Sequence, residues 1–314
     1  MTSAAIEIGT NSIKLLVMKG GAARAVVLAD RNEIARLGEG AAASGRLSEA
    51  AMERAVLIIA DMADRARSLG CEQPLAIATQ ALRAASNAED FKSRVKRECG
   101  VDLTVISGEE EADLSFRAVL SALPGGAGRI CAFDVGGGSS EIVTGSASGV
   151  AYRRSVPVGA LSLHDEFFSQ SGRSGPVLAR VLEAAAGKVR MALRDEASGG
   201  LAEIPGIRDA AICGVGGTIT TLAAVALSVD PYDVAKVSGT RLSINEIQRQ
   251  IEMFAATSVP ERARIRGLNP KRADIILAGA CIVAELLGYA GAEGVIVLDR
   301  GVRYGVMEKY FNLK

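Results

Sequence analysis

One short pattern occurs twice in the chain with the same internal spacing, and it constrains the fold more than any other feature. In residues 5–18, AIEIGTNSIKLLVM, an apolar run carries the acid Glu7, a glycine follows two positions later and a serine five positions later. In residues 130–144, ICAFDVGGGSSEIVT, Asp134 takes the place of the acid, and the glycine and serine recur at the same offsets. Each copy is typical of a strand, a turn of small residues and a second strand. Because strand and helix patterns alternate after both copies, the repeat predicts two related α/β domains with a cleft between them.

The acid and the small residues of each copy suit a phosphate that carries a metal ion. A carboxylate holds a hard cation directly or through water. Glycine lets the backbone come close to phosphate oxygens, and its N–H groups and nearby hydroxyls donate hydrogen bonds. The three consecutive glycines at 136–138 also fit an ordinary hairpin turn. The acid before them and the matched copy favour phosphate binding, and two copies that face each other would hold a phosphate chain from both sides.

The composition narrows the class of protein and its partners. A chain of 314 residues suggests about two domains, and its formal net charge of zero means that a polyanion must be held by local basic clusters. His164 is the only histidine, which excludes multi-histidine zinc sites and histidine–aspartate metal centres. The five scattered cysteines indicate reduced thiols and predict a cytoplasmic protein. We expect no signal sequence, no membrane-spanning helix and no nucleic-acid partner.

A glycine-rich stretch marks the boundary between the predicted domains. Residues 124–128, PGGAG, are the strongest linker candidate. We therefore predict an N-terminal domain of residues 1–124 and a C-terminal domain of residues 125–300. Within the first domain, apolar residues at helical spacing predict a long helix with Ser48 as its N-cap and Gly70 as its C-cap.

The segment GVGGTITTL at 214–222 is a candidate for a third anion loop. Gly216 and Gly217 precede Thr218 at the start of a predicted helix, and the N-terminus of a helix suits an anion. The segment lacks the G-K-[ST] ending of a Walker loop and the spacing of a dinucleotide fingerprint. A plain strand-to-helix turn is therefore an equal alternative.

Two further segments carry candidate catalytic and binding side chains. SGEEEADL at 107–114 puts three acids in the first turn of a predicted helix. Ser107 as N-cap and the helix dipole account for one or two of them, whereas a carboxylate that orients and deprotonates a water molecule would account for the third. In TQALRAASN at 79–87, Arg83 and Asn87 lie one turn apart on one helix face. Arg83 either forks onto phosphate oxygens or faces solvent.

Basic residues also gather in short clusters, at Arg153–Arg154, Arg262–Arg266 and Lys271–Arg272. Such clusters either follow a long polyanion or form solvated faces, and solvated faces are the commoner outcome.

Taken together, these motifs resemble the exopolyphosphatase/guanosine pentaphosphate phosphatase (Ppx/GppA) family over nearly the whole chain. The matching segments, in order, are IEIGTNSIKLLV, ATQALRAASN, ISGEEEA, FDVGGGSSE, SVPVGAL, GVGGTITTLA, RADIILAG and DRGVRYGVM. The resemblance implies two actin-like (ribonuclease H-like) α/β domains that flank an interdomain cleft, with a closing helix at about 301–314 packed on the first domain. It implies Mg²⁺-dependent release of terminal phosphate from inorganic polyphosphate, guanosine pentaphosphate or both, and it suggests a homodimer.

The resemblance also implies roles for individual residues. Glu111 matches the catalytic base of the family, and Asp134 matches the acid of the second phosphate loop, which positions metal or water. The metal-binding acids would be Glu7, Glu111 and Asp134. The substrate-binding residues would be Gly9, Thr10, Asn11, Ser12, Lys14, Arg83, Gly136, Gly137, Gly138, Ser139, Ser140, Gly216, Gly217 and Thr218.

Three residues depart from the family pattern. Glu7 stands where Asp is usual, Lys14 stands where Arg is usual, and Ser162 stands where Arg is common, so one phosphate contact is absent. The chain also ends without the C-terminal helical domain of long members, which favours shorter chains or nucleotides as substrates. Two alternatives therefore remain: an ATP-hydrolysing or kinase-like protein of the same superfamily, and a weakly catalytic regulator that binds polyphosphate or guanosine tetraphosphate.

Overall fold

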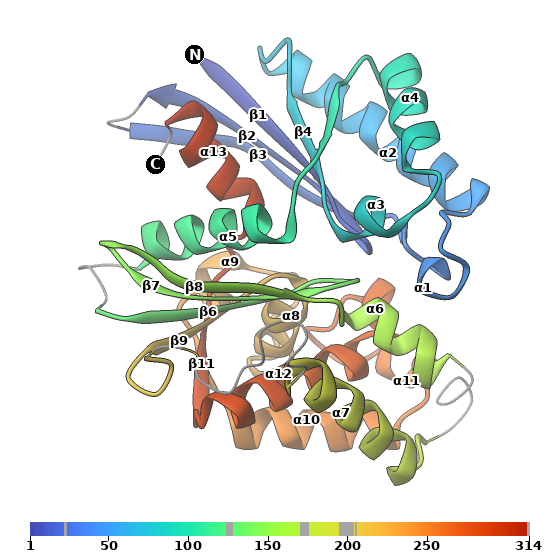
Figure 1. The fold of residues 1–314 in the computed structure, drawn as a ribbon, viewed down its shortest axis with the longest axis vertical. Helices are drawn as coiled ribbons and strands as arrows, with labels where there is room; N and C mark the ends of the chain where they lie inside the picture. The colour runs from blue at the N-terminus through green and yellow to red at the C-terminus, as the bar shows by residue number, and fades with distance from the viewer. Residues whose placement is uncertain (22–23, 124–127, 170–175, 195–203, 205, 313–314) are drawn as a thin grey trace. The chain divides into compact units, whose positions relative to one another are not determined.

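A computed structural model of the chain describes residues 1–21, 24–123, 128–169, 176–194, 204 and 206–312 (Figure 1). The chain forms two compact units. Unit 1 comprises Met1–Ser121 together with Gly301–Lys314, and unit 2 comprises Ala122–Arg300. Most of the predicted linker, 124–128, lies outside the described residues.

Unit 1 is built on a five-stranded mixed sheet in the order β3-β2-β1-β4-β5. The strands are β1 (Thr2–Ile8), β2 (Ser12–Gly21), β3 (Arg24–Ile34), β4 (Leu75–Ala78) and β5 (Leu103–Val105). The first three strands pair antiparallel, whereas β4 and β5 join parallel to β1. The helices are α1 (Ala41–Ser44), α2 (Glu49–Ser68), α3 (Gln80–Ala84), α4 (Ala88–Cys99), α5 (Gly108–Ala122) and α13 (Val302–Phe311).

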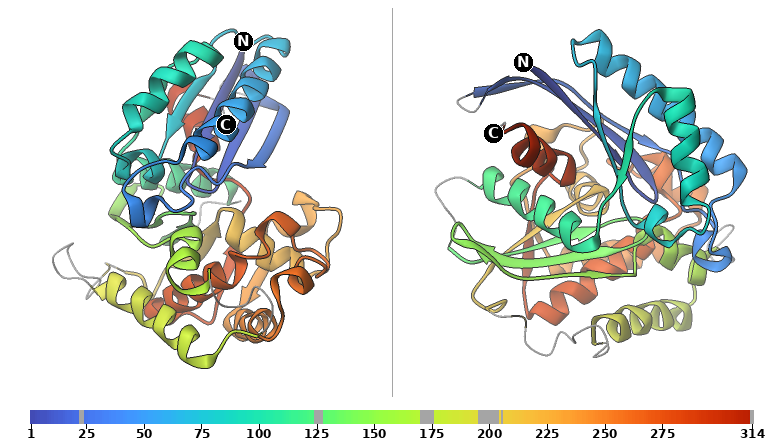
Figure 2. Two further views of the ribbon diagram at one scale, coloured as in Figure 1. Left: turned by 90° about the vertical axis from the view of Figure 1, so that its right-hand side faces the viewer. Right: turned by 45° about the horizontal axis from the view of Figure 1, so that its top comes forward.

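Helices cover both faces of the unit 1 sheet. Figure 2 shows α2 and α4 together on one face, where α2 buries its predicted apolar stripe. The Ser48 side chain caps α2 as predicted, accepting a hydrogen bond from the Ala51 N–H at 3.2 Å. The predicted C-cap was one residue too late, because Leu69 takes that position and Gly70 follows it with φ +90°.

The closing helix α13 packs on the other face of the sheet, against β1, β2 and α5. Val302, Val306 and Met307 supply the apolar contact, and they are buried. Gly305 brings the backbones of α13 and α5 together, since a Cβ on Gly305 would lie 2.0 Å from the Leu114 carbonyl oxygen. The last helix of the chain therefore belongs structurally to the first unit.

Unit 2 is built on a six-stranded mixed sheet in the order β10-β11-β9-β6-β7-β8. The strands are β6 (Ile130–Val135), β7 (Ser140–Ser146), β8 (Gly149–Val156), β9 (Ala211–Val215), β10 (Arg241–Ser243) and β11 (Gly294–Val297). The helices are α6 (Ala160–Leu163), α7 (Ala179–Arg194), α8 (Gly217–Ala226), α9 (Val234–Val237), α10 (Ile244–Ala256), α11 (Val259–Arg262) and α12 (Ile276–Ala290). A π-helical turn at His164–Phe168 continues α6, and a 3₁₀ turn at Pro270–Arg272 precedes α12. In Figure 1, α7, α10 and α12 lie on one side of this sheet.

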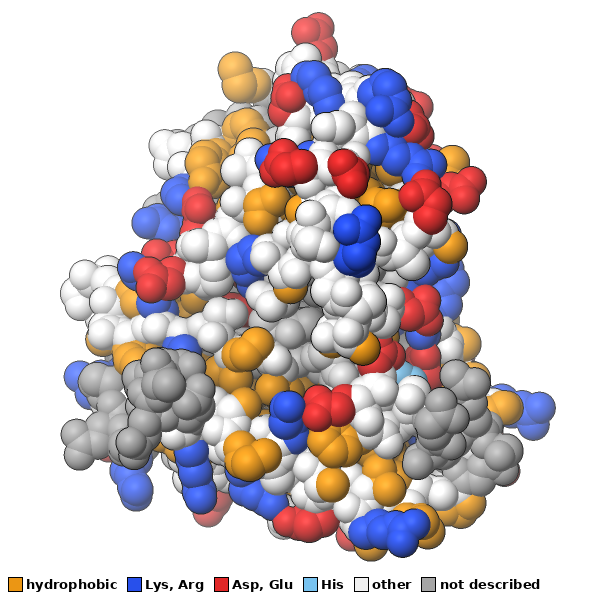
Figure 3. Space-filling model, turned by 45° about the vertical axis from the view of Figure 1, so that its right-hand side comes forward, with side chains coloured by type: hydrophobic (Ala, Val, Ile, Leu, Met, Phe, Trp, Pro, Cys, Tyr) orange, Lys and Arg blue, Asp and Glu red, His pale blue; other side chains and the backbone are white. Residues whose placement is uncertain are grey.

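Within the described residues, no helix combines the length and apolar character that crossing a membrane requires. On the face drawn in Figure 3, Lys and Arg side chains are interspersed with Asp and Glu side chains. This mixture agrees with the zero formal net charge of the sequence.

Candidate functional site

The two predicted turns have the same hydrogen-bonded geometry. In unit 1 the Gly9 N–H donates to the Ser12 carbonyl oxygen at 2.9 Å, and in unit 2 the Gly136 N–H donates to the Ser139 carbonyl oxygen at 3.0 Å. Each turn joins two antiparallel strands. The last paired residues before the first turn are Ile8 of β1 and Ile13 of β2, and those before the second turn are Val135 of β6 and Ser140 of β7. The sequence repeat is therefore a structural repeat.

The carbonyl groups of the first turn are held by the segment that follows β3. Thr10 O accepts from the Gly38 N–H at 2.9 Å, and Asn11 O accepts from the N–H groups of Ala35 and Arg36 at 3.0 and 2.9 Å. Among the residues described, the N–H groups of Thr10 and Asn11 donate to no backbone carbonyl. The turn therefore has its acceptors occupied and its donors available.

The second turn repeats this arrangement. Gly136 O accepts from the Ala160 N–H at 2.9 Å, and Gly137 O accepts from the N–H groups of Leu161 and Ser162 at 2.8 and 3.0 Å. A Cβ on Gly159 would lie only 2.4 Å from the Gly137 backbone, so close packing is one reason for glycine here. Across 128–169, the N–H groups of Gly137 and Gly138 donate to no backbone carbonyl. A turn with free donors and occupied carbonyls suits an anion.

The serines around the second turn have local partners. Ser139 Oγ donates to Glu141 Oε1 at 2.7 Å, and Ser140 Oγ donates to the Val158 carbonyl at 2.7 Å. Ser162, which stands where the family commonly has Arg, donates to Gly159 O at 3.1 Å and accepts from the Gly159 N–H at 3.0 Å. These hydroxyls stabilise the turn and the start of α6, so the second turn offers a ligand mainly its backbone.

Both carboxylate oxygens of Glu7 accept a hydrogen bond. Lys14 lies opposite it on β2, and its Nζ is 2.6 Å from Glu7 Oε1. The Arg303 N–H, at the start of α13, donates to Glu7 Oε2 at 3.1 Å. Glu7 is buried, with 6% of its surface exposed. The ammonium of Lys14 therefore supplies a positive charge to the carboxylate that the family resemblance assigned to a metal site. The hairpin register that places Lys14 opposite Glu7 was available from the sequence.

Glu111 forms an ion pair with Arg83, so the structure joins two predicted site residues of unit 1. Arg83 Nη1 lies 2.8 Å from Glu111 Oε2, and the side chains are 18% and 10% exposed. The same Nη1 also donates to Ile106 O at 3.0 Å, and Gln80 Oε1 accepts from Nε and Nη2 at 3.2 and 3.0 Å. Four contacts on one guanidinium fix its orientation. Arg83 is thus placed to orient the Glu111 carboxylate.

Glu110, the acid that precedes Glu111 in the 107–114 segment, has structural partners. Ser107 Oγ accepts from the Glu110 N–H at 3.1 Å, as predicted for an N-cap. The Glu110 carboxylate accepts from Lys309 Nζ and from the Tyr310 hydroxyl, both at 2.6 Å. These hydrogen bonds, that of Lys309 foremost, hold the pKa of Glu110 below its usual range. Glu110 therefore anchors α5 to α13.

Asp134 stands half-buried at the end of β6, beside the third predicted loop. It pairs laterally with Val215, the last residue of β9. Gly216 follows with φ +90°, and a Cβ at this position would lie 2.6 Å from Asp134 Oδ1. Glycine is required here both by the backbone conformation and by the closeness of the carboxylate. The structure therefore brings the second and third predicted loops together.

Arg272, from the basic cluster Lys271–Arg272, lies on the third loop. A Cβ on Gly217 would lie between 2.3 and 2.5 Å from its guanidinium atoms, so the group stacks on the first turn of α8. Arg272 is 7% exposed, and burial lowers the pKa of its guanidinium to about 10, against the opposing effects of Tyr232 and Asp299. Tyr232 and Asp299 are the titratable groups whose charges act on this guanidinium.

Thr218 and two arginines of the predicted basic clusters make hydrogen bonds to backbone carbonyls. Thr218 Oγ1 donates to Val135 O at 3.3 Å, which ties α8 to β6. Arg154 donates to the Ala192 and Leu193 carbonyls at the end of α7, and the buried Arg262 donates to the Thr257 carbonyl. Each of the three basic clusters thus includes a buried arginine, and Arg154 and Arg262 donate to backbone carbonyls.

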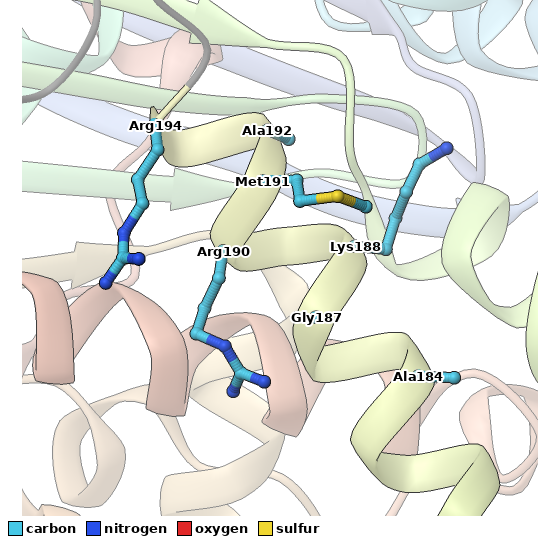
Figure 4. Close-up of a pocket in the computed structure, with 7 residues that line it drawn as sticks. All are labelled: Ala184, Gly187, Lys188, Arg190, Met191, Ala192 and Arg194. Atoms are coloured by element: carbon cyan, nitrogen blue, oxygen red, sulfur yellow. The ribbon is translucent and has the colours of Figure 1, made fainter.

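A hollow of about 740 Å³ lies along α7. Figure 4 shows Lys188, Met191 and Arg194 among the side chains that line it. Arg190, at the same hollow, is held by Glu183 and lies 2.8 Å from Glu285. No residue predicted for the site lines this hollow.

The placement of the described acids, histidine and cysteines bears on how a metal ion could be held. Within the described ranges, no group of three or more His, Cys, Asp or Glu side chains is placed to hold a metal ion. Mg²⁺ is commonly bound by one or two carboxylates together with substrate phosphates and water. Asp134 suits that mode of binding, because it is partly exposed beside the free N–H groups of the second turn.

Comparison with known proteins identifies the class of this fold and site. The fold class predicted from the sequence, α/β units of the actin-like type, is confirmed by solved structures. The structure described as the Aquifex aeolicus PPX-GPPA enzyme matches with a TM-score of 0.79 and 32% identity, over 98% of this chain and 99% of that chain. A structure described as an exopolyphosphatase-like protein matches with a TM-score of 0.89 and 26% identity, over 99% of both chains.

Sequence comparison gives the family. The model of the Ppx/GppA phosphatase family matches residues 16–312, and the chain belongs to this family. Exopolyphosphatase 2 of Mycobacterium tuberculosis is 32% identical over 96% of both chains. The bifunctional 3-dehydroquinate synthase/phosphatase of Fusobacterium nucleatum is 28% identical, and the match spans 94% of this chain but 44% of that protein. The chain is therefore a hydrolase of the phosphatase type.

Proposed function

We propose that the protein is a Mg²⁺-dependent exopolyphosphatase, which releases terminal phosphate from inorganic polyphosphate, guanosine pentaphosphate or both. The observation that carries the proposal is the duplicated turn: an acid at the end of a strand, carbonyls turned into the protein and N–H groups left for an anion. The similarity to exopolyphosphatases of M. tuberculosis supports polyphosphate as substrate.

Glu111 is the proposed general base. A water molecule attacks the terminal phosphorus, its proton passes to the Glu111 carboxylate, and the bond to the bridging oxygen breaks so that the shortened chain leaves as an anion. Arg83 orients the carboxylate through the 2.8 Å ion pair and is itself fixed by Gln80 and Ile106. Such positioning is valuable because in-line attack depends on the alignment of water and phosphorus.

Each of the two turns is proposed to bind phosphate oxygens through its backbone. The N–H groups of Gly137 and Gly138 would donate to phosphate oxygens, as would those of Thr10 and Asn11 in the first turn. Lys14 adds a fixed positive charge beside the first turn, already paired with Glu7. Arg272, a buried cation on the first turn of α8, would add a further contact for a phosphate at the third loop.

Asp134 would hold Mg²⁺, directly or through water. When bound, the ion would neutralise the negative charge that builds up on the phosphate oxygens. We assign Glu7 no metal contact, because its oxygens already accept from Lys14 and Arg303.

Phosphate release from four substrates tests the proposal: short polyphosphate, long polyphosphate, guanosine pentaphosphate and ATP, each with and without Mg²⁺. We expect release from polyphosphate or guanosine pentaphosphate only with Mg²⁺. The Glu111→Gln variant should remain folded and lose about two or more orders of magnitude in turnover. Asp134→Asn should require more Mg²⁺. Turnover of ATP alone, or a fully active Glu111→Gln variant, would contradict the assignment.

We further propose a cytoplasmic location and a homodimer, on the strength of the family resemblance. Light scattering of the purified protein tests the dimer.

A further inference from the structure

Unit 1 contains two buried asparagines with opposite environments. Asn87 is 5% exposed, and both polar atoms of its amide form a hydrogen bond with the backbone of Leu47. Oδ1 accepts from the Leu47 N–H at 2.9 Å, and Nδ2 donates to Leu47 O at 3.0 Å. Asn11, in the first turn, is 4% exposed, and within the described structure neither Oδ1 nor Nδ2 has a hydrogen-bond partner. As placed, Oδ1 meets no donor and Nδ2 meets no acceptor among the described residues.

The usual structural reasons for asparagine in a turn do not apply to Asn11. Asparagine is favoured in turns because it tolerates a positive φ or because its side chain hydrogen-bonds to nearby backbone. The described non-glycine residues with positive φ are Arg36, Ser228 and Asn312, and Asn11 is not among them. Its side chain makes no backbone hydrogen bond either. A buried amide without partners lowers stability, so its presence needs another explanation.

The chemistry of the amide indicates what the missing partner must offer. Nδ2 donates hydrogen bonds, whereas Oδ1 accepts them. The oxygens of a terminal phosphate are mostly deprotonated near neutral pH and therefore accept. A phosphate alone could satisfy Nδ2 but not Oδ1, while a water molecule beside that phosphate satisfies Oδ1 with an O–H. At the matching position the second turn has Gly138, so it offers an anion only backbone donors.

We propose that Asn11 binds the attacking water of the hydrolysis. Oδ1 accepts one O–H of the water, Nδ2 donates to an oxygen of the phosphate under attack, and the second O–H gives its proton to Glu111 as the oxygen bonds to phosphorus and the bridging bond breaks. The inference rests on the proposed phosphohydrolase function. The backbone of Asn11 is already fixed, because its carbonyl accepts from Ala35 and Arg36. Both amide atoms are buried as well as without partners among the described residues.

Thermal unfolding without ligand separates this role from a structural one. Asn11→Leu removes a polar group that has no partner, so the variant should unfold at the same temperature as the wild type or at a higher one. Asn87→Leu is the matched control: it strands the Leu47 N–H and carbonyl and should unfold at a lower temperature. If Asn11→Leu is destabilised as much as Asn87→Leu, the amide has a structural partner and the proposal is wrong.

Steady-state kinetics with short polyphosphate and Mg²⁺ supply the second readout. Asn11→Leu should lower kcat by about a hundredfold, comparable to the loss of one positioned hydrogen bond in other hydrolases, with a smaller change in KM. Asn11→Asp keeps an acceptor for water but brings a negative charge to the phosphate, so it should raise KM and retain more of kcat. Equal loss of kcat in both variants would contradict the proposal. Full recovery of Asn11→Leu at high Mg²⁺ would also contradict it, because the amide would then serve the hydration shell of the cation.

The activity of the wild-type protein separates a failure of the proposed function from a failure of the proposed role of Asn11. If the wild type releases no phosphate from any substrate, the proposed function fails. If the wild type is active and Asn11→Leu has the same kcat, the function stands and only the role of Asn11 is wrong.

Discussion

Replacing Gly216 with alanine tests whether the third loop sets the position of the Asp134 carboxylate. Two effects follow from the structure. Gly216 has φ +90°, so an alanine there is strained by about 1–2 kcal/mol. In addition, the new Cβ would lie 2.6 Å from Asp134 Oδ1, closer than carbon and oxygen can approach, so the carboxylate must move by several tenths of an ångström.

Gly239 provides a matched control in the same unit. Its φ is +91°, and a Cβ there would have nothing within 4 Å. Gly239→Ala therefore carries the backbone strain without the collision. Both variants should lower the unfolding temperature of unit 2 by about 2–8 °C, since each kcal/mol corresponds to roughly 2–4 °C for a unit of this size.

Activity should separate the two variants. A displacement on the order of 1 Å at a reacting centre can cost about a hundredfold in rate, so we expect Gly216→Ala to approach that loss in kcat/KM while Gly239→Ala stays near the wild type. The assay is phosphate release at saturating and limiting Mg²⁺, beside thermal unfolding of both variants. If Gly216→Ala is as active as Gly239→Ala, the closeness of Gly216 and Asp134 has no functional meaning and the reasoning is refuted.

Two further predictions concern charges outside the turns. Lys309→Met removes the main hydrogen bond that lowers the pKa of Glu110. A carboxyl with a lowered pKa stabilises the fold above its unfolded pKa of about 4.5, and this contribution disappears as pH falls through the folded pKa. At pH 7 the free energy of unfolding of the variant should be lower than that of the wild type by up to about 1 kcal/mol, and this difference should vanish in strong acid. Urea unfolding from pH 7 into strong acid measures it. A difference that stays constant over this pH range would contradict the pairing of Lys309 with Glu110. Arg272→Met replaces a buried guanidinium that rests on Gly217, so the substrate-free protein should be equally or more stable, while affinity for pyrophosphate should fall by about tenfold or more. Calorimetry that finds unchanged affinity would remove Arg272 from the site.

The repeat, the fold class and the family could be predicted from the sequence because they depend on local patterns. The acid, glycine and serine of each turn lie within six residues of one another, and the strand pairing of a short hairpin follows from them. Hydroxyl caps such as Ser48 and Ser107 were predictable for the same reason, since an N-cap acts within three residues.

Contacts between distant segments could not be predicted. Glu7 accepts from the backbone of Arg303, 296 residues away, and no local pattern links the two. The prediction that Arg83 and Asn87 share one helix face was wrong, because α3 ends at Ala84 and Asn87 precedes α4. Arg83 pairs with Glu111, whereas Asn87 is buried against Leu47. Arg272 looked like one of several basic residues, and only its stacking on the third loop distinguishes it.

The most direct test of the central claim is an amide chemical-shift titration of the labelled protein with pyrophosphate and Mg²⁺. The account predicts that the N–H groups of Thr10, Asn11, Gly137 and Gly138 shift together, saturably and at the same ligand concentration. Saturable binding that leaves the amides of both turns unchanged would contradict it, because the phosphates would then lie elsewhere on the protein.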